Sequence, residues 1–297
     1  MESENPLFSI IVVTYNSSNY VLETLESAKV QTYRNIELIV TDDCSTDNTV
    51  EICRNWINEN KKRFVRTELI TVEKNTGISP NVNRGFKAAK GEWVKPIAGD
   101  DILNPECIST FIQYSSKHPD TCFFFSGMEI FGTGEFSEKR AGVKRWISQA
   151  LESFSEGSDL KVQAKKLKYR NLVSSPSAIY QVKAFRTLGG FDEDIKLLED
   201  HPFWLKAIRN GYKILSINEQ LVRYRVNGIS VQTSPAFKMA KELFLQKHIF
   251  KNIFFPLIIQ SINQLKIEPK DKFLCNLLKL TSLPQMFVYK IKKKLQI

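Results

Sequence analysis

Short runs of apolar residues alternate with polar stretches along the first hundred residues of this chain. The runs are rich in Ile and Val, a composition typical of strands that are buried on both faces. They occupy residues 8–16, 36–40, 68–72 and 93–98. Between the runs, apolar residues recur every three or four positions, as Val21, Leu25 and Ala28 do, which predicts amphipathic helices. This alternation predicts a doubly wound, mostly parallel α/β sheet.

Polar residues mark the expected starts of the first two helices. Ser17 or Ser18 follows the first strand and can accept a hydrogen bond from a backbone N–H of the first helical turn. Asp47 or Asn48 has the same place before the second helix. We therefore expect side-chain caps at these two points.

The second half of the chain has a less regular pattern. Segment 123–175 predicts a strand or two at its start, then helical pieces around 146–154 and 160–167. Clearer periodicity follows, with a strand over 177–182 and a short helix over 183–188. A Gly-Gly turn and an apolar helix complete this part of the chain.

Polar residues follow all four of the first predicted strands. In a parallel sheet the carboxyl ends of the strands meet at one edge, and ligands of open α/β sheets bind there. We therefore expect a ligand site built from the residues at these ends. They are Thr14, Tyr15, Asn16, Asp42, Asp43, Asn75, Gly77, Asp100 and Asp101.

Asp100 and Asp101 end the fourth strand, where two adjacent carboxylates are unfavourable unless a positive group meets them. The chain has no G-x-x-x-x-G-K-[ST] motif, and no G-x-G-x-x-G follows its first strand, so a bound diphosphate needs another source of positive charge. A divalent cation, Mn²⁺ or Mg²⁺, held by few carboxylates would supply it. One aspartate would bind the cation directly, and the other would face a ribose or act through water. The alternative is a pair of turn or capping aspartates.

For two further acidic pairs, a role in binding or catalysis and a role as a helix cap are both open. Asp42 and Asp43 can accept hydrogen bonds from a base N–H or a ribose hydroxyl, or can cap the next helix. Glu199 and Asp200 precede an apolar helix, where a carboxylate can serve as a cap or as a general base. His201 has no second His or Cys at ligand spacing and is interpreted as a neighbour, not as a metal ligand.

The net charge of +10 is concentrated at the end of the chain. Residues 238–297 hold twelve lysines and no arginine against three acidic residues, a net charge of +9. The rest of the chain therefore gives no electrostatic reason to expect a nucleic-acid partner. The lysines lie among apolar residues, which predicts either a helix bound to an anionic membrane surface or an ordinary helical appendage.

Cysteine usage and hydropathy favour a cytoplasmic protein. The five cysteines show no C-x-x-C spacing and are odd in number, as expected of reduced thiols and not of a disulfide framework or a zinc site. The first ten residues do not resemble a signal peptide. Uninterrupted apolar runs stay shorter than the roughly 18 residues that a spanning helix needs.

Six blocks, in order, resemble the family 2 glycosyltransferases with the GT-A fold, which move a sugar from a nucleotide donor with inversion at the anomeric carbon. They are "SIIVVTYN", "IELIVTDDCSTDNT", "NTGISPNVNRGFKAAKGEW", "IAGDD", "GGFDE…LLEDHPFWLK" and "LVRYRVNGISV". The resemblance implies a GT-A domain over 1–235, with a nucleotide-binding half at 1–105 and an acceptor and catalytic-base half at 106–235. A basic amphipathic helical tail at 236–297 would follow.

By position, the resemblance implies a role for individual residues. Asp43 matches the carboxylate that reads the base, Asp42 supports it, and Arg225 could face the diphosphate. Asp101 matches the direct metal ligand, and Asp200 matches the catalytic base. The implied nucleotide-sugar site comprises Thr14, Tyr15, Asn16, Asp42, Asp43, Asn75, Gly77, Asn83, Asp100 and Arg225.

The chain departs from the family pattern at two positions. Val82 stands where the family often has an arginine, so one usual cationic contact is missing. Asn227 stands where the family often has a histidine, which puts a metal or phosphate role at that position in doubt.

The implied activity is transfer of a sugar, from a UDP-sugar in the first instance, to a hydroxyl of a glycan or lipid-linked acceptor in surface polysaccharide synthesis. Asp200 would take the proton of the acceptor hydroxyl, and a cation at Asp101 would stabilise the leaving diphosphate. A catalytically silent sugar-nucleotide-binding protein and a nucleotidyltransferase remain as alternatives. The expected location is cytoplasmic, peripheral to the inner face of the membrane if the tail binds it, and a homo-oligomer is compatible with the sequence.

Overall fold

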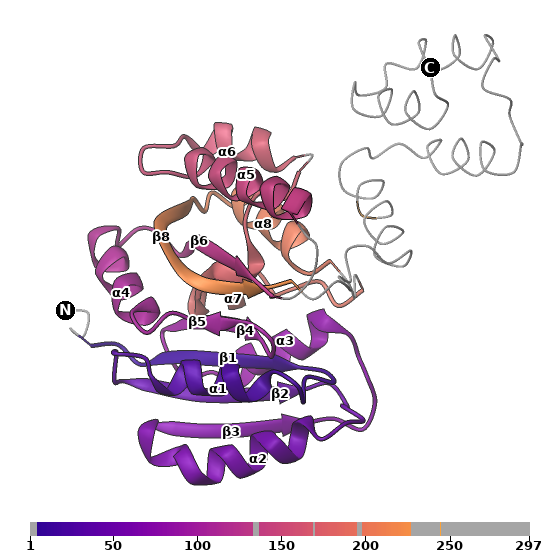
Figure 1. Ribbon diagram of the computed structural model, residues 1–297. Coiled ribbons are helices and arrows are strands. Elements are labelled where there is room, and N and C mark those ends of the chain that lie inside the picture. Colours follow the sequence, from indigo (N-terminus) through magenta and orange to yellow (C-terminus); the bar gives the residue numbers. More distant parts are fainter. Residues whose placement is uncertain (1–4, 133–136, 169, 195–197, 227–243, 245–297) are drawn as a thin grey trace, which may run out of the picture. The chain divides into compact units, whose positions relative to one another are not determined.

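Strands and helices follow one another in the order that the sequence pattern predicts (Figure 1). The computed structural model describes residues 5–132, 137–168, 170–194, 198–226 and 244. Its strands are β1 Phe8–Thr14, β2 Ile36–Asp42, β3 Arg66–Thr71, β4 Trp93–Ala98, β5 Ile102–Leu103, β6 Phe123–Phe131, β7 Ala178–Gln181 and β8 Ile214–Arg225. Its α-helices are α1 Val21–Lys29, α2 Thr49–Asn60, α3 Ile78–Ala88, α4 Cys107–Lys117, α5 Ser137–Ser153, α6 Leu160–Leu167, α7 Val182–Thr187 and α8 Asp200–Arg209. Short 3₁₀ turns are η1 Lys61–Arg63 and η2 Ser175–Ser177.

The described strands form one eight-stranded sheet in the order β3-β2-β1-β4-β7-β6-β8-β5. β3, β2, β1 and β4 are parallel, as are β6 and β8. β7 runs antiparallel between β4 and β6, and β5 runs antiparallel to β8. The predicted mostly parallel α/β sheet is therefore confirmed, with antiparallel pairs confined to its second half.

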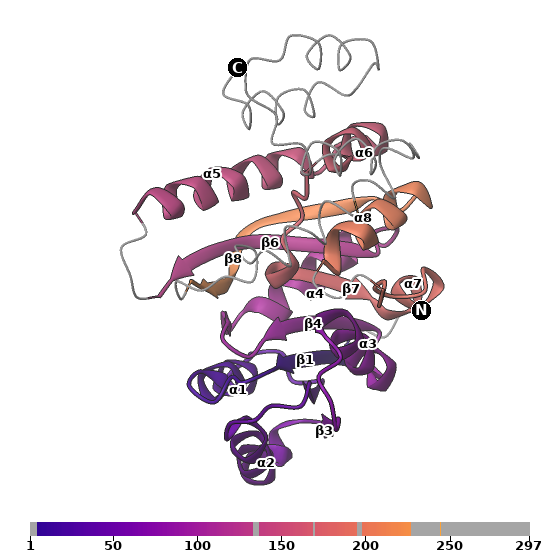
Figure 2. The same ribbon diagram turned by 90° about the vertical axis from the view of Figure 1, so that its right-hand side faces the viewer.

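Helices cover both faces of the parallel strands, as a doubly wound sheet requires. Phe8, Ile10 and Val12 of β1 are fully buried in one apolar cluster with Val21 and Leu25 of α1. Figure 2 shows α1 and α2 on this face of the sheet and α3 on the other. Successive strand residues point to opposite faces, so continuous apolar runs are what a strand covered on both sides needs.

On the second face, α3 approaches β1 closely because Gly85 has no side chain. A Cβ added at Gly85 would lie 2.4 Å from Cγ2 of Ile11, which real structures do not tolerate. Gly85→Ala is therefore expected to lower the free energy of unfolding by about 1–3 kcal/mol, despite the better helix propensity of alanine.

Thermal unfolding of two glycine variants checks this close packing. In α5, a Cβ at Gly142 would meet nothing within 4 Å, so Gly142→Ala should raise stability by up to about 1 kcal/mol. Stability changes of the same sign in both variants would contradict the close approach of α3 to β1.

A buried carboxylate at the opposite end of the strands serves the fold and not the site. Glu37 of β2 is fully buried and accepts hydrogen bonds from Ser9 Oγ at 2.6 Å and from the N–H of Gly91 at 2.9 Å. Its second oxygen accepts Nη1 of Arg66 at 2.8 Å. Burial alone would raise the pKa of Glu37, but these donors outweigh burial and lower it.

Aromatic side chains pack α8 against β7 and pack α3 against α7. Tyr180 of β7 stacks on Trp204 of α8 with ring centroids 5.1 Å apart, and Phe86 of α3 stacks on Phe185 of α7 at 3.7 Å. Burial of such large rings is a major source of stability. The start of α8, which carries Asp200, is consequently fixed by its own apolar face.

Most predicted strand and helix ends lie within two residues of the observed ones, but α5 begins at Ser137 and not near 146. The predicted cap of the first helix is wrong, and Asn48, the N-cap of α2, makes no side-chain cap hydrogen bond. β4 and α6 begin and end where the sequence places them. Asp47 does accept a hydrogen bond from the N–H of Thr49 at 3.0 Å, at the start of α2. The first helix has Tyr20 as its N-cap, without a side-chain cap, instead of Ser17 or Ser18. The backbone carbonyl of Ser17 accepts the N–H of Val21 at 2.9 Å, so that turn is closed by the main chain.

The end of the chain forms a separate unit. One compact unit spans Met1–Phe244 and a second spans Leu245–Ile297. Apart from the buried Phe244, the predicted tail at 236–297 lies outside the described residues, as does Asn227, so the predicted domain boundary stays a prediction. Within the described ranges, none of the helices combines the length and apolar character needed to cross a membrane.

Candidate functional site

Three neighbouring strands, β2, β1 and β4, end side by side, and their polar ends meet as predicted. At the end of β1, the carbonyl of Thr14 accepts the N–H of Asp43 at 3.0 Å, and the carbonyl of Val13 accepts the N–H of Gly99 at 2.9 Å. The main chain therefore brings the Asp42–Asp43 and Asp100–Asp101 loops to the same edge of the sheet. This is the edge where ligands bind in open α/β folds.

Asp42 holds the first two loops of this edge together. Its carboxylate accepts hydrogen bonds from Thr14 Oγ1 at 2.8 Å, Ser45 N at 2.8 Å and Ser45 Oγ at 2.5 Å. Asn16 has a left-handed backbone (φ 51°), and its Oδ1 accepts the N–H of Thr46 at 2.8 Å. Tyr15, between Thr14 and Asn16, is 51% exposed. Asp42 thus supports the loops, and Tyr15 leaves about half of its surface open to solvent.

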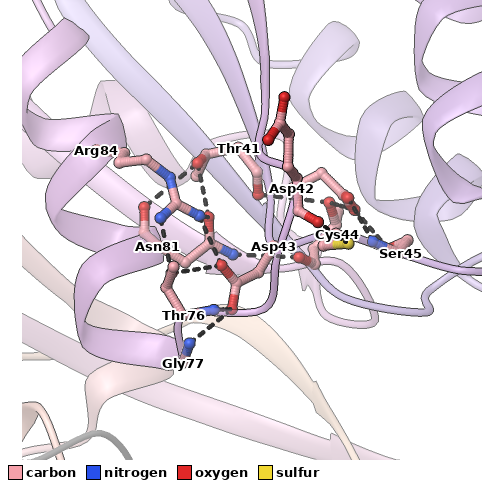
Figure 3. Close-up of polar contacts among 11 residues, drawn as sticks. Thr41, Asp42, Asp43, Cys44, Ser45, Thr76, Gly77, Asn81 and Arg84 are labelled. Atoms are coloured by element: carbon pink, nitrogen blue, oxygen red, sulfur yellow. Dashed lines mark hydrogen bonds and ion pairs between the residues drawn. The ribbon is translucent and has the colours of Figure 1, made fainter.

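Asp43 is buried, and each of its two carboxylate oxygens accepts two hydrogen bonds (Figure 3). Oδ2 accepts the backbone N–H groups of Thr76 at 2.9 Å and Gly77 at 2.7 Å, while Oδ1 accepts Thr76 Oγ1 at 2.6 Å and Arg84 Nη2 at 2.8 Å. Burial by itself would raise the pKa of Asp43, but these donors outweigh it and lower the pKa. Asp43 therefore fixes the loop before α3, and a base N–H could be accepted only in exchange for one of these donors.

Arg84 is a residue of this edge that sequence reasoning missed. Its Nη2 contacts Asp43 and also donates to Asn81 Oδ1 at 3.0 Å, and its Nη1 donates to Thr76 Oγ1 at 2.8 Å. The absence of the family's usual arginine at Val82 could have pointed to Arg84, because the guanidinium of a residue two positions further along α3 still reaches the end of β2. Thr41 Oγ1 completes this network with a 2.6 Å hydrogen bond to Asn81 Oδ1.

Arg84→Ala is expected to lower the free energy of unfolding by about 1–3 kcal/mol, because the nearly buried carboxylate of Asp43 would lose its cation. Thermal unfolding measures the change. Arg54→Ala, on the exposed face of α2, is the matched control and should lie within about 0.5 kcal/mol of the parent protein. Equal stability of the two variants would count against this role of Arg84.

Asp101 is 1% exposed, and a hydrogen bond holds only one of its two carboxylate oxygens. Its Oδ1 accepts the backbone N–H of Arg225 at 2.8 Å, whereas its second oxygen makes no hydrogen bond in the described part of the chain. The neighbouring Asp100 is only half-buried. Below this pair, the fully buried Lys95 donates to the carbonyls of Pro96 at 2.6 Å and Pro176 at 2.5 Å, and burial lowers the pKa of Lys95 to about 8.

The electrostatics of this aspartate pair suit a cation. Burial raises the pKa of both Asp100 and Asp101, and the charge of Asp100 raises that of Asp101 further. Among the residues that the structure describes, no group of three or more His, Cys, Asp or Glu side chains is arranged to hold a metal ion. The pair fits a cation that takes one or two protein oxygens and completes its shell with phosphate oxygens and water, as Mg²⁺ does.

Arg225 joins three elements beside this pair. Its Nε donates to the carbonyl of Asp100 at 2.7 Å and its Nη2 to Glu23 of α1 at 2.8 Å. The guanidinium lies over the rings of Tyr20 at 4.5 Å and Phe131 at 4.3 Å. These contacts make Arg225 a brace of the Asp100 loop, and the predicted contact of Arg225 with a diphosphate stays a prediction.

Asp200 is the first residue of α8 and is held on both oxygens. Oδ1 accepts the N–H of His201 at 2.7 Å, and Oδ2 accepts Nδ2 of Asn171 at 2.7 Å. Burial, followed by the charge of Asp200, raises the pKa of the adjacent Glu199. The ring of His201 is buried, with Nε2 2.7 Å from the carbonyl of Leu167, so His201 serves the helix packing.

The remaining predicted residues lie around the loop before α3. Asn75 is exposed, and Gly77 has a positive φ of 98° and donates its N–H to Asp43. Asn83 turns away from this loop: its Nδ2 donates to the carbonyl of Phe191 at 3.0 Å and to Glu193 Oε1 at 2.9 Å. Its amide therefore ties α3 to the turn that precedes α8, and the predicted ligand contact of Asn83 remains untested.

Comparison with known proteins gives a family and a fold. The family model described as glycosyl transferase family 2 matches residues 9–189. An uncharacterized glycosyltransferase from Haemophilus influenzae is 27% identical over 284 residues, which cover 90% of this chain and 82% of the relative.

Two proteins of known structure have the same fold. The poly(ribitol-phosphate) beta-N-acetylglucosaminyltransferase TarS of Staphylococcus aureus is 27% identical over 80% of this chain and 38% of its own length. TarS 1-349 matches with a TM-score of 0.60 at 25% identity over 80% of this chain, and it has also been solved with UDP and with UDP-GlcNAc. The mannosyltransferase PcManGT from Pyrobaculum calidifontis, solved with GDP-Man and Mn²⁺, matches with a TM-score of 0.62 at 18% identity over 83% of this chain. This chain spans 64% of each of these two structures.

Proposed function

Because the chain belongs to glycosyl transferase family 2 and has the GT-A fold, we propose that it transfers a sugar with inversion from a nucleotide-diphosphate donor to a hydroxyl of a glycan or lipid-linked acceptor. The observation that carries this proposal is the meeting of the Asp42–Asp43 and Asp100–Asp101 loops at one edge of the sheet. A glycine-rich phosphate loop is absent from the sequence, so this acidic edge is the place where a diphosphate can be bound together with a cation.

Asp101 is the proposed protein ligand of a Mn²⁺ or Mg²⁺ ion. Its Oδ1 accepts the N–H of Arg225, which supports a role for its second oxygen as the cation ligand, and Asp100 would face the ribose or a coordinated water. The bound cation would supply positive charge to the leaving diphosphate. The mannosyltransferase that shares the fold was solved with Mn²⁺, which supports the choice of ion.

Asp200 is the proposed general base. Its carboxylate is fixed at the start of α8 by hydrogen bonds on both oxygens, so the direction of the carboxylate is defined. In the proposed reaction, Asp200 accepts the proton of the acceptor hydroxyl while that oxygen attacks the anomeric carbon opposite the diphosphate. The proton is thus removed on one side of the sugar and the leaving charge is stabilised on the other.

A UDP-sugar is the proposed donor because TarS, which shares the fold, has been solved with UDP and with UDP-GlcNAc. A thermal-shift panel of UDP-GlcNAc, UDP-glucose, UDP-galactose and GDP-mannose, each with and without Mn²⁺, tests the donor. A donor at 100 times its Kd should raise stability by about 2.7 kcal/mol, and only with the metal present. Stabilisation by none of these nucleotides would oppose the proposal.

The remaining parts of the proposal concern the surroundings of the enzyme. The lysine-rich tail at 236–297 suits an anionic membrane surface, which would bring a cytoplasmic enzyme to lipid-linked acceptors for surface polysaccharide synthesis. Co-sedimentation of the full chain with anionic liposomes at moderate salt tests this part. A chain that stays in the supernatant would favour an ordinary helical appendage.

A further inference from the structure

Asn171 contacts the proposed base, Asp200, and belongs to a part of the chain that holds none of the predicted site residues. It lies between α6 and η2, and its Nδ2 donates to Asp200 Oδ2 at 2.7 Å. Since an ionised carboxylate only accepts hydrogen bonds, the NH₂ group of the amide must be the side that faces it. The contact is therefore a directed hydrogen bond to a charge, the stronger class of hydrogen bond.

The backbone of Asn171 is held in place by α5. The carbonyl of Asn171 accepts Nε1 of Trp146 at 3.0 Å, and the preceding Arg170 donates from Nη1 to Gln149 Oε1 at 3.1 Å. Two contacts on one helix thus fix the residue that contacts Asp200. The segment 123–175 therefore contacts the proposed base, Asp200, through Asn171.

The other end of the Asn171 amide is left unsatisfied. Its Oδ1 is buried and has no hydrogen-bond partner among the described residues. A buried carbonyl oxygen without a donor is unfavourable, and native structures contain few of them. The amide of Asn171 therefore keeps its NH₂ group on Asp200 although its own oxygen is left without a donor.

We propose that Asn171 is a positioning residue for Asp200: its Nδ2 fixes Oδ2 so that the carboxylate presents a defined lone pair to the acceptor hydroxyl. This inference rests on the proposed function, in which Asp200 is the base. A base within hydrogen-bond reach acts efficiently only when its direction is fixed, so loss of the amide should slow proton removal without changing how the donor is held.

Steady-state kinetics on the full-length protein test the inference. With Mn²⁺ and UDP-GlcNAc, or with the nucleotide sugar that gives the largest thermal shift, release of the nucleoside diphosphate should be about tenfold slower for Asn171→Ala. The KM for the donor should be unchanged. Gln149→Ala, which removes only the contact with Arg170, is the control and should keep the parental turnover. A parental kcat for Asn171→Ala would overturn the inference.

A thermal-unfolding cycle gives a second readout that needs no turnover. The Tm losses of Asn171→Ala and Asp200→Asn should be smaller in the double variant than their sum, because both remove the same hydrogen bond. Additive losses would overturn the inference. Failure of the proposed base is distinguishable, because then Asp200→Asn itself would turn over at the parental rate, whatever the result for Asn171→Ala.

Discussion

Asp200→Asn is expected to lower turnover by about 100-fold or more while leaving donor affinity nearly unchanged. Asparagine keeps the size of the side chain and an oxygen for the N–H of His201, but it cannot take a proton from a hydroxyl. UDP release under saturating donor measures the loss of turnover, and thermal shift with the same donor measures its binding.

Asp159 provides the matched control for this variant. It precedes α6, and its carboxylate caps that helix by accepting the N–H of Lys161 at 2.7 Å. Asp159→Asn should change stability slightly and leave turnover at the parental rate. If the two variants behaved alike, Asp200 would be a structural cap and the general base would have to be sought elsewhere.

The second large effect is expected at Asp101. Asp101→Asn should remove at least about a tenfold gain in UDP affinity that Mn²⁺ provides, because a neutral amide is a weaker ligand for a hard cation. Its Oδ1 can still accept the N–H of Arg225, so the loop should keep its position. Isothermal titration of UDP with Mn²⁺ and with EDTA measures the metal-dependent part directly.

Glu37→Gln is the control, because Glu37 is also a buried carboxylate but lies at the opposite end of the strands. This variant is expected to lose stability and to keep the metal-dependent gain in UDP affinity. Parental UDP binding that EDTA does not weaken would contradict the cation site at Asp101.

The parallel half of the fold could be predicted because each strand there is buried on both faces. Such strands are continuous apolar runs, and β4 matches its predicted run at both ends. The second half was less predictable, because its strands depend on partners distant in sequence. β8 pairs with β6 through two register shifts near Gly127, and no local pattern specifies such a pairing.

The site shows the same division. The Asp42–Asp43 and Asp100–Asp101 pairs could be placed at one edge because strand order alone brings them there. The hydrogen-bond partners of each aspartate could not be predicted. Asp42 accepts hydrogen bonds from Thr14 and Ser45, whereas Asp43 accepts one from Arg84, which lies on a helix, 41 residues further along the chain. Asn171 was missed for a similar reason, because only tertiary packing places an irregular loop beside α8.

The central claim is that the acidic edge and Asp200 together catalyse sugar transfer, and product identity tests it most directly. The full-length protein would be incubated with Mn²⁺ and the best-bound nucleotide sugar, with and without added pyrophosphate, and the nucleotide products separated. With water as the acceptor in this assay, the proposed function predicts free sugar and free nucleoside diphosphate, formed at a rate that Asp200→Asn lowers about 100-fold or more, because Asp200 takes the proton of the attacking water. Formation of nucleoside triphosphate and sugar 1-phosphate from added pyrophosphate would identify a nucleotidyltransferase, and binding of the donor without turnover would identify a silent binding protein; either result would contradict the claim.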